Sequence, residues 1–398
     1  MIQDRSSRVS TCILKRGPGR HLLASALASI AILLVVSAVT NKAAAQLTIL
    51  HSFGDGSVTN DGANPSDGLV QAPNGDFYGV TIDQARQTSR AAGTIFKMTA
   101  AGKVSIIHRF GLKSNMWASG PLVYDNGQLV GIVSGTAVFA LSNLGRGWQF
   151  SIWHTFTGGR DDGADAVGGL TLGPGGTLYG LTAYGGTNNA GTVYEFNPSA
   201  SRPFSIVYDF LNTGYWSPGA ALVLANDGNL YGSTTQFEQP PFPIGGIFRL
   251  TPHGQFTVVA SLFGYPPTQA PLIQASDGNL YGTIPFFEHY DGSVFSVGTS
   301  CCFDPFYTFT PFDFGTNPVG ALVQGPNGNL YGVTNLTVFE VSTDGSFFKV
   351  LHIFGDGSVP HDGSSPNGGL VLGQDGNLYG TTYSGGSAGL GTIFRISP

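Results

Sequence analysis

The chain has 398 residues, of which 59 are glycine and only 11% are charged. This composition suits many short strands joined by tight turns and argues against long helices. The formal net charge of −6 gives no basic excess, so we expect no nucleic acid partner.

Residues 1–45 differ from the rest of the chain and have the pattern of an export signal. A basic leader precedes an apolar run from Leu22 to Val39, and Ala43-Ala44-Ala45 follows as a small-residue pattern that signal peptidase accepts. The run of 18 residues is also just long enough for a membrane-spanning helix. We therefore expect a signal peptide or an uncleaved anchor, with contact to a membrane only through this segment. The remainder is expected to be secreted, periplasmic or on the cell surface.

One short phrase, a turn followed by Leu-Tyr-Gly or a close variant, occurs seven times after residue 45. Its glycines lie 52, 49, 52, 50, 50 and 48 residues apart, and a period in this range indicates a repeat architecture. The seven copies are Phe77-Tyr78-Gly79, Leu129-Val130-Gly131, Leu178-Tyr179-Gly180, Leu230-Tyr231-Gly232, Leu280-Tyr281-Gly282, Leu330-Tyr331-Gly332 and Leu378-Tyr379-Gly380.

Each repeat contains four strand-sized apolar segments, named A to D. In the last repeat, residues 369–372, 375–382 and 391–397 are the A, B and C segments, and residues 348–354 are the D segment before them. Asn-Gly, Asp-Gly or Gly-Gly stands between A and B in every repeat, and these pairs favour a type I′ hairpin turn. Seven four-stranded meanders predict an all-β fold, a seven-bladed β-propeller that occupies residues 46–398 as a single domain.

The two ends of this region are predicted to complete each other. Residues 47–53 form a lone D segment, and residues 391–397 form a C segment with no D segment after it. Pairing the two segments gives the last blade its outer strand and removes two exposed sheet edges. The N-terminal strand is therefore expected to close the ring by completing the last blade.

The residue before the A-segment leucine is small or proline in every repeat, which suits inner strands crowded around a central channel. These residues are Gly68, Pro121, Gly169, Ala221, Pro271, Ala321 and Gly369.

The phrase Gly-x-Leu-Tyr-Gly-Thr-Thr, followed by Gly-Gly, Gly-Thr-Ile-Phe and Leu-His-x-Phe, resembles the GloVer tandem repeat of bacterial exported proteins. The last repeat matches best, through residues 375–386, and the resemblance covers residues 47–398. It implies extracellular or cell-surface placement and transfers no catalytic residue. Members often carry a separate C-terminal anchor, and this sequence departs from that pattern because it ends on a blade strand at Pro398 with no sorting tail.

Four histidines occupy one repeat position, two residues before the last phenylalanine of the D segment. Equivalent positions on different blades point apart, so these side chains cannot meet at one metal ion. We expect each to have a structural role and to bond a neighbour. They are His51, His108, His154 and His352.

Three acidic, glycine-rich loops leave a Ca²⁺ site open as an alternative to no cofactor at all. They lie at residues 55–62, 160–165 and 356–363, and none has the spacing of a known calcium loop. Asx-turns explain their composition, so no metal-ligating residue is named.

The sequence contains no motif typical of a catalytic site, so no catalytic residue is named and we favour a protein that is not an enzyme. A polysaccharide lyase or hydrolase stays open, because sequence cannot place acids of different blades at the separation that such chemistry requires. A purely structural envelope protein is the third interpretation.

The candidate binding face is the one formed by the B–C and D–A loops. A meander places these loops on one side of the ring and the A–B and C–D turns on the other. The loops vary in length and contain many aromatic residues, among them Trp117, Tyr184 and Tyr383. Exposed aromatic rings near amide or carboxylate groups stack on sugars or anchor a protein partner.

The densest aromatic cluster lies in blades 4 and 5, and the chain is expected to be a monomeric binding module for a glycan or an extracellular protein. The predicted ligand-binding residues are Trp216, Phe237, Glu238, Phe287, His289 and Tyr290.

Cys301 and Cys302 lie in the C–D turn of blade 5. An oxidising compartment disfavours two free exposed thiols, so we expect a disulfide between these neighbours, with a pair of partly buried thiols as the alternative.

Overall fold

The computed structural model describes ten stretches of the chain. They are residues 46–82, 91–111, 116–143, 145–210, 216–236, 244–262, 268, 270–285, 292–310 and 315–398. The structure gives only the backbone of Ala91, Ala92, Trp216, Ser217, Thr235, Gln236 and Ile244. The predicted signal peptide at 1–45 lies outside the described residues. Ala45–Pro398 forms one compact unit, and its described part contains no helix with the length and apolar character needed to cross a membrane.

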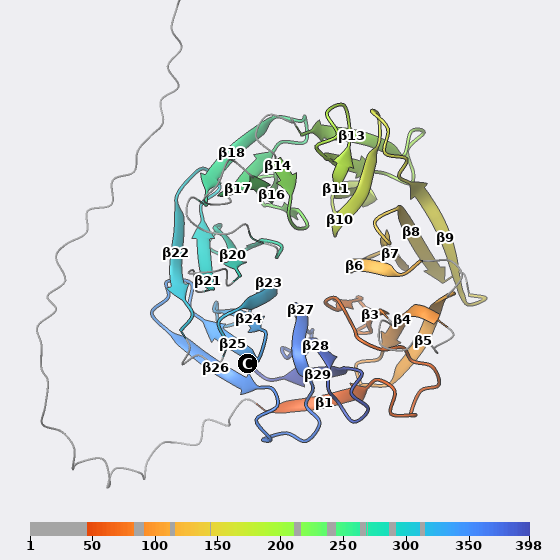
Figure 1. Cartoon of the computed structure of the whole chain (residues 1–398), viewed down its shortest axis with the longest axis vertical. Coiled ribbons are helices and arrows are strands. Elements are labelled where there is room, and N and C mark those ends of the chain that lie inside the picture. The colour runs from red at the N-terminus through yellow and green to blue at the C-terminus, as the bar shows by residue number, and fades with distance from the viewer. Residues whose placement is uncertain are drawn as a thin grey trace, which may run out of the picture. The chain divides into compact units, whose positions relative to one another are not determined.

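Seven antiparallel sheets follow one another around a ring, and in six of them the strands run in chain order from the centre outward, whereas β1 is the outermost strand of the seventh (Figure 1). Blade 1 contains β2 (Val70–Gln71), β3 (Phe77–Ile82), β4 (Ala91–Met98) and β5 (Val104–Gly111). Blade 2 contains β6 (Ala118–Asp125), β7 (Gln128–Val133), β8 (Ala137–Asn143) and β9 (Trp148–Thr155). Blade 3 contains β10 (Gly163–Leu172), β11 (Leu178–Gly185), β12 (Thr192–Phe196) and β13 (Phe204–Asp209), with the short 3-10 turn η2 (Pro174–Gly176).

In blade 4 the inner strand is divided into β14 (Trp216–Pro218) and β15 (Val223–Leu224), and both pair with β16 (Leu230–Gln236), which precedes β17 (Ile244–Leu250) and β18 (Phe256–Ser261). Blade 5 contains β19 (Ile273–Gln274), β20 (Leu280–Ile284), β21 (Ser293–Val297) and β22 (Phe303–Thr308). Blade 6 contains β23 (Pro318–Gln324), β24 (Leu330–Thr334), β25 (Thr337–Val341) and β26 (Phe348–Ile353). Blade 7 contains β27 (Ser364–Leu372), β28 (Leu378–Ser384), β29 (Thr392–Ile396) and β1 (Leu47–Ser52). The predicted seven-bladed β-propeller is confirmed.

Blade 7 joins the two ends of the propeller. Strand β1 pairs antiparallel with β29, from Leu47 opposite Ile396 to Ser52 opposite Thr392. Phe53, directly after β1, is fully buried. The predicted closure by the N-terminal strand is confirmed, and it pairs both sheet edges that the repeat would otherwise leave open.

The A–B turns differ from the prediction in five blades. Only the turns at Asn126-Gly127 and Gly175-Gly176 have two consecutive residues with positive φ. In blade 1 the amide of Gly75 donates to the carbonyl of Ala72 over 2.9 Å, and glycine alone is left-handed; blades 4 to 7 repeat this pattern. These are type I turns closed by a left-handed glycine, so the type I′ prediction is wrong there. The longer turn keeps the Asx residue out of the left-handed region and lets its oxygen accept the N–H two residues on, as Asp227 does over 3.0 Å.

The tyrosine of the Leu-Tyr-Gly phrase packs between blades. The buried apolar residues that the structure describes form seven clusters, each at a boundary between two neighbouring blades, and six of these contain such a tyrosine. The ring centroid of Tyr379 in blade 7 lies 4.2 Å from that of Phe77 in blade 1. Its hydroxyl donates to Asp375 of its own A–B turn over 2.8 Å. Tyr231, Tyr281 and Tyr331 also bond a residue of their own A–B turn, so in blades 4 to 7 the tyrosine joins that turn to the neighbouring blade.

The glycine of the phrase leaves room for an aromatic ring. Gly380 lies opposite Phe394 in the sheet, and a β-carbon at Gly380 would come within 2.5 Å of that ring and 3.0 Å of Leu370. The corresponding glycine faces a phenylalanine or a tyrosine in every blade. A larger residue would displace the core, which explains why this glycine recurs.

The inner strands of neighbouring blades approach each other backbone to backbone. A β-carbon on Gly68 of blade 1 would lie 2.5 Å from the carbonyl oxygen of Gly368 in blade 7. One on Gly169 of blade 3 would lie 2.9 Å from the ring of Pro121 in blade 2. The small residues before the A-segment leucine therefore fit the crowded centre that the sequence predicted.

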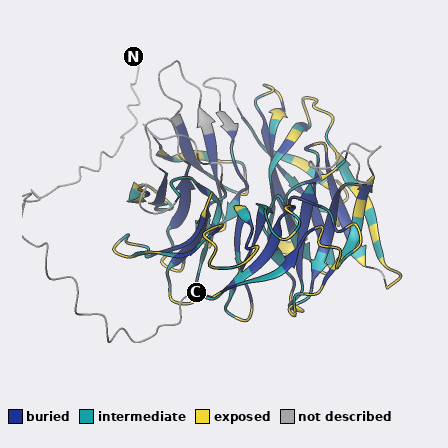
Figure 2. Ribbon diagram, turned by 60° about the horizontal axis from the view of Figure 1, so that its bottom comes forward, coloured by how far each residue is buried: buried dark blue, intermediate teal, exposed yellow. Residues whose placement is uncertain are grey.

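The outer strands add a second set of contacts between blades. The ring of His108 in blade 1 stacks on Phe150 of blade 2 with centroids 4.6 Å apart. Equivalent stacks join His154 to Phe204, Tyr208 to Phe256 and Tyr307 to Phe348. Figure 2 shows the result: the strands are buried where blades meet, and exposed residues gather in turns, loops and parts of the outer strands.

A disulfide joins Cys301 and Cys302 in the turn between β21 and β22, as the sequence predicts. Cys302 is left-handed, with φ of 76°. In the same turn the carbonyl of Thr299 accepts a hydrogen bond of 3.2 Å from the hydroxyl of Tyr231 in blade 4. The bridged turn therefore contacts the neighbouring blade.

Candidate functional site

The propeller has two faces of different character. The face with the B–C and D–A loops is named the loop face, and the face with the A–B and C–D turns is named the turn face. In blade 4 the start of the inner strand, at Trp216, lies opposite Gln236 at the end of β16, whereas Leu224 lies opposite Leu230 at the A–B turn. The same strand order in every blade puts all loops of one kind on one face.

On the turn face, glutamines join the A–B turns of neighbouring blades. Gln71 donates to the carbonyl of Gly75 over 3.1 Å and accepts from the backbone N–H of Gln374 in blade 7 over 2.9 Å. Gln274 and Gln324 make the same two contacts in blades 5 and 6. These polar groups are used by the scaffold, which favours the loop face as the place for a ligand.

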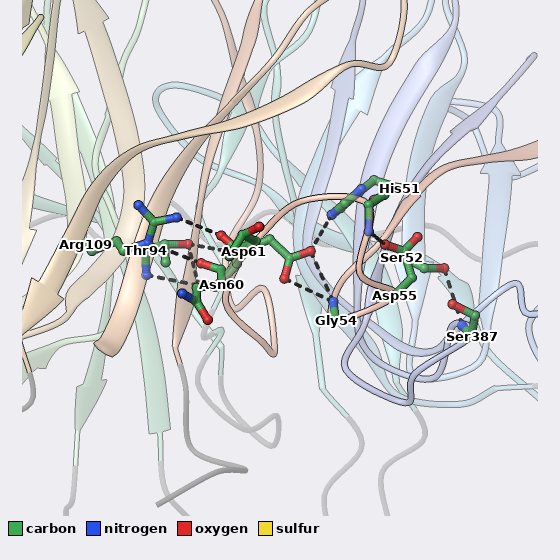
Figure 3. Close-up of polar contacts among 12 residues, drawn as sticks. His51, Ser52, Gly54, Asp55, Asn60, Asp61, Thr94, Arg109 and Ser387 are labelled. Carbon is green, nitrogen blue, oxygen red and sulfur yellow. Dashed lines mark hydrogen bonds and ion pairs between the residues drawn. The ribbon is translucent and has the colours of Figure 1, made fainter. Parts of the chain in front are cut away.

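On the loop face, the D–A loop that leads from blade 7 to blade 1 is held by a His–Asp pair (Figure 3). Nε2 of His51 in β1 lies 2.9 Å from a carboxylate oxygen of Asp61. The same carboxylate accepts the backbone N–H of Gly54 over 3.1 Å. Both side chains are buried. Asp61 therefore fixes the first and last parts of the loop to each other.

The far side of this loop is bound to blade 1. The guanidinium of Arg109 in β5 donates to the carbonyl of Thr59 over 2.8 Å and to that of Asn60 over 3.3 Å. The hydroxyl of Thr94 in β4 donates to the carbonyl of Asp61 over 3.0 Å (Figure 3). The loop is thus tied to both blades that it connects.

Two further D–A loops contain the same pair. Nε2 of His154 lies 3.0 Å from Asp162, and Nε2 of His352 lies 2.8 Å from Asp362. His108 instead stacks on Phe150, and burial lowers its pKa. The expected hydrogen bond to a neighbour is confirmed for His51, His154 and His352, whereas His108 makes a stacking contact instead. Sequence reasoning did not identify their aspartate partners, although an Asp-Gly pair follows each of these histidines at a distance of eight or ten residues.

Asx-turns shape the two loops that were considered for calcium at 55–62 and 356–363. The carboxylate of Asp55 accepts the N–H of Ser57 over 2.8 Å, and that of Asp356 accepts the N–H of Ser358 over 2.7 Å. Together, these turns and the His–Asp pairs account for every aspartate in the two loops. No cluster of three or more His, Cys, Asp or Glu residues suited to a metal ion occurs among the described residues.

Hydrogen bonds determine the charge state of Asp162, the aspartate paired with His154. Burial raises the pKa of the Asp162 carboxyl, but hydrogen bonds from Thr157, His154 and Gly163 outweigh it, and the pKa lies below its ordinary value. Asp162 is therefore ionised at neutral pH. Near the channel, burial raises the pKa of the Asp67 carboxyl; its partners there are the hydroxyl of Ser66, at 2.7 Å, and the N–H of Gly120.

A pair of buried hydroxyls closes the loop-face end of several blades, and blade 4 lacks it. Thr382 and Thr392 lie with their hydroxyls 2.8 Å apart in blade 7, and blades 1, 3 and 6 contain the same pair. In blade 4, Thr234 lies opposite Gly246. Its buried hydroxyl has no hydrogen-bond partner in the part of the chain that the structure describes.

The structure describes little of the predicted binding residues. Trp216 begins β14 on the loop face, and its side chain is not described. The other five lie outside the described residues, in the stretches between β16 and β17 and between β20 and β21. They are Phe237, Glu238, Phe287, His289 and Tyr290. Whether their side chains come together stays a prediction.

Two other loop aromatics are well exposed on the loop face. Trp117 is 42% exposed and Tyr184 is 55% exposed. Tyr383 is half-buried. Phe347, in a C–D turn of the turn face, is 43% exposed.

Comparison with known proteins concerns the family and the fold. The Gloeobacter/Verrucomicrobia repeat model matches residues 134–336. No curated protein matches the chain in sequence. The extracellular domain of a proposed hybrid two-component system from B. thetaiotaomicron is a similar solved structure, with a TM-score of 0.58 at 12% identity over 88% of this chain and 39% of that one. A gluconolactonase from Xanthomonas campestris gives a TM-score of 0.45 at 15% identity over 89% of each chain. A luciferin-regenerating enzyme gives 0.45 at 11% identity over 89% of this chain and 95% of that one.

Proposed function

The chain belongs to the Gloeobacter/Verrucomicrobia repeat family, and from this premise we propose that it is an exported β-propeller whose loop face binds carbohydrate. Export is supported by the signal pattern at residues 1–45 and by the Cys301–Cys302 disulfide, since such bonds persist in oxidising compartments.

The observation that carries the binding proposal is how the aromatic residues divide between scaffold and loops. The tyrosines of the repeated phrase are buried between blades, whereas Trp117, just before β6, and Tyr184, near the end of β11, are exposed on one face. An aromatic ring exposed to water is unfavourable for folding and contributes nothing to the core. Exposed rings on a rigid loop face are typical of surfaces that stack on sugars.

The main contact is assigned to blades 4 and 5, where the loops contain Trp216, Phe237, Glu238, Phe287, His289 and Tyr290. Support comes from the neighbouring strands: Trp216 starts β14 on the loop face, and the buried hydroxyl of Thr234 lacks the partner that other blades provide.

The test is a glycan array probed with residues 46–398, followed by calorimetric titration of the best hit. The double variant Trp216→Ala, Phe287→Ala should lose binding while keeping the melting temperature. Phe347→Ala is the matched control, because it removes an exposed aromatic ring from the turn face. Normal binding by the double variant would place the site elsewhere.

Catalysis on the same face is the competing function, and a reducing-sugar assay on every array hit separates the two. A binding module releases no new reducing ends. Turnover that disappears in the double variant would replace the binding proposal with a polysaccharide-active enzyme.

A further inference from the structure

Trp117 is held rigidly at the loop-face end of blade 2. Its backbone N–H donates to the hydroxyl of Ser134 over 3.1 Å, and the N–H of Ser134 donates back to its carbonyl over 2.9 Å. This pairing adjoins the start of β6, where Ala118 lies opposite Val133, and Ser134 itself is in the left-handed region with φ of 47°. The indole is therefore presented by a hydrogen-bonded backbone and not by a free loop.

The strand alternation directs the indole toward blade 3. Side chains of successive strand residues point to opposite faces of a sheet. Ala118 and Val133 belong to the buried cluster between blades 1 and 2. Ile132, opposite Ser119, belongs to the cluster between blades 2 and 3. Trp117 has the same parity as Ser119, so it points to the blade 3 side.

Tyr184 points the opposite way, from blade 3 toward blade 2. It is in β11, with the same parity as Leu178, which packs in the cluster between blades 2 and 3. Tyr179 and Leu181, of the other parity, pack against blade 4. At 55% exposure, the phenol of Tyr184 stands above that cluster at the loop-face end of the strand.

An acidic side chain lies at the same boundary, since Asp165 follows Ala164, which lies opposite Tyr184, and approaches Gly135, which follows Ser134. A β-carbon on Gly135 of blade 2 would come within 2.5 Å of a carboxylate oxygen of Asp165 in blade 3. The N–H of Ala166 donates to the carbonyl of Gly135 over 2.7 Å, which fixes this contact. Asp165 is exposed, and its carboxylate has no hydrogen-bond or ion-pair partner within the described ranges.

We propose that Trp117, Asp165 and Tyr184 form a binding site for a neutral carbohydrate chain above the boundary between blades 2 and 3. This inference rests on the proposed function and names a second place and a ligand class for it. Two exposed rings directed to one blade boundary, with a carboxylate at the same boundary, match the chemistry of a sugar, whose C–H faces pack on aromatic rings while adjacent hydroxyls donate to an acidic group.

Charge selects neutral over acidic glycans. The Asp165 carboxylate would repel a uronate, sulfate or phosphate group placed beside it. The region after residue 45 adds to this repulsion, because the leader holds six of the 18 basic and one of the 24 acidic residues, and the remainder has a formal net charge of −11.

The site is pre-organised by the pair that holds the neighbouring loop. Asp162 bonds His154 and the N–H of Thr157, and the N–H of Gly158 donates to the carbonyl of Gly163 over 3.0 Å. Gly163 starts β10, two residues before Asp165. Binding there needs little ordering of the backbone, which lowers the entropic cost of association.

The test is titration of residues 46–398 with a panel of soluble neutral polysaccharides, including xyloglucan and galactomannan, and with polygalacturonate as the acidic probe. Trp117→Ala and Tyr184→Ala should each weaken binding of the neutral hit about tenfold or more. Asp165→Asn should weaken it and raise the affinity for polygalacturonate. Leu336→Ala is the matched control, because Leu336 occupies the position of Tyr184 in blade 6 and is 44% exposed.

The outcomes separate this inference from the proposed function. Neutral binding that all three variants leave unchanged, with melting temperatures preserved, would overturn the site at blades 2 and 3 and leave the loop-face function intact. A wild-type preference for polygalacturonate would overturn the neutral-ligand assignment. No binding to any glycan by the wild-type protein would contradict the proposed function and this inference together.

Discussion

The D–A loops that enter blades 1, 3 and 7 differ from those that enter blades 4, 5 and 6. The first group is held by buried or partly buried His–Asp pairs at His51, His154 and His352. In the second group the histidine position contains Tyr208, Ser261 and Tyr307. Blade 4 also lacks the hydroxyl pair, because Gly246 lies opposite Thr234.

The turn face shows no such difference. Tyr231 in blade 4 donates to Asp227 over 2.7 Å and Tyr281 in blade 5 donates to Asp277 over 2.6 Å, as Tyr379 does to Asp375 in blade 7. Blades 4 and 5 therefore keep the scaffold contacts of the repeat without its loop-face contacts. Blade 2 also lacks the hydroxyl pair, because Val133 lies opposite Ala137 there. Departures from a repeated local rule often mark the surface that a protein uses, and those in blades 4 and 5 agree with the proposed place of the main binding contacts.

Removing β1 should have the largest effect, because it takes the outer strand from blade 7 and one member of the His51–Asp61 pair. A protein that starts at Gly54 loses the burial of Leu47 and the ladder to β29 as well. We expect its free energy of unfolding to fall by roughly 5 kcal/mol or more, since a single large-to-small change in a core costs about 2–5 kcal/mol. Thermal unfolding measures the effect, and a protein that starts at Leu47 is the control. Equal melting temperatures would contradict closure by β1.

High pH should destabilise both groups of blades alike, because both contain the turn-face tyrosine. Burial raises the pKa of Tyr78, Tyr231, Tyr281 and Tyr331 to about 12. The folded state then holds more protons than the unfolded state between about pH 10 and 12, so stability is complete below pH 10 and falls as the pH rises through that range. Tyrosinate absorbance should increase together with loss of the β-sheet circular dichroism signal. Ionisation well before unfolding would show that these hydroxyls are not held by the scaffold.

Breaking one His–Asp pair should lower the free energy of unfolding moderately, and this loss is expected only in the first group of loops. Asp362→Ala leaves His352 buried without its partner, and we expect a loss of about 1.5–3 kcal/mol, the usual range for a hydrogen bond to a charged group. Asp356→Ala, in the same loop but exposed, should change stability little. Ser261→Ala should also be nearly neutral. Denaturant unfolding compares the three, and an equal loss for Asp356→Ala would remove the special role of the pair.

Restoring the missing hydroxyl pair in blade 4 should change the free energy of unfolding least, and it should raise that free energy. Gly246→Thr supplies a partner for Thr234 and a β-branched residue in a strand, so we expect a gain of about 1 kcal/mol. Thr392→Gly in blade 7 is the reverse change and should cost stability. If Gly246→Thr instead lowered the stability, the space opposite Thr234 would not accommodate a threonine side chain.

The fold was predictable because its information is local and repeated. Each tyrosine and glycine of the phrase repeats one contact in a new blade, and the period of Gly79, Gly131 and their equivalents gives the number of blades directly. The order of the end segments predicts the pairing of β1 with β29, since only that pairing completes a blade.

The loop-face contacts were less predictable because they join residues whose relation is spatial. His51 and Asp61 both stood out in the sequence, but as members of two different motifs, and only the returning loop brings them together. The turn type failed for a similar reason: Asp227 was interpreted by its glycine neighbour, whereas its bonds to the N–H two residues on and to Tyr231 determine its conformation.

The most direct test of the account is backbone hydrogen exchange of residues 46–398, measured with and without a saturating neutral oligosaccharide taken from the array. We expect new protection in the loop-face stretches, among them 156–163 and 184–191, and none in the A–B turns at 225–229 and 275–279. Protection of the turns, with the loop-face stretches unchanged, would contradict the assignment of ligand binding to the loop face.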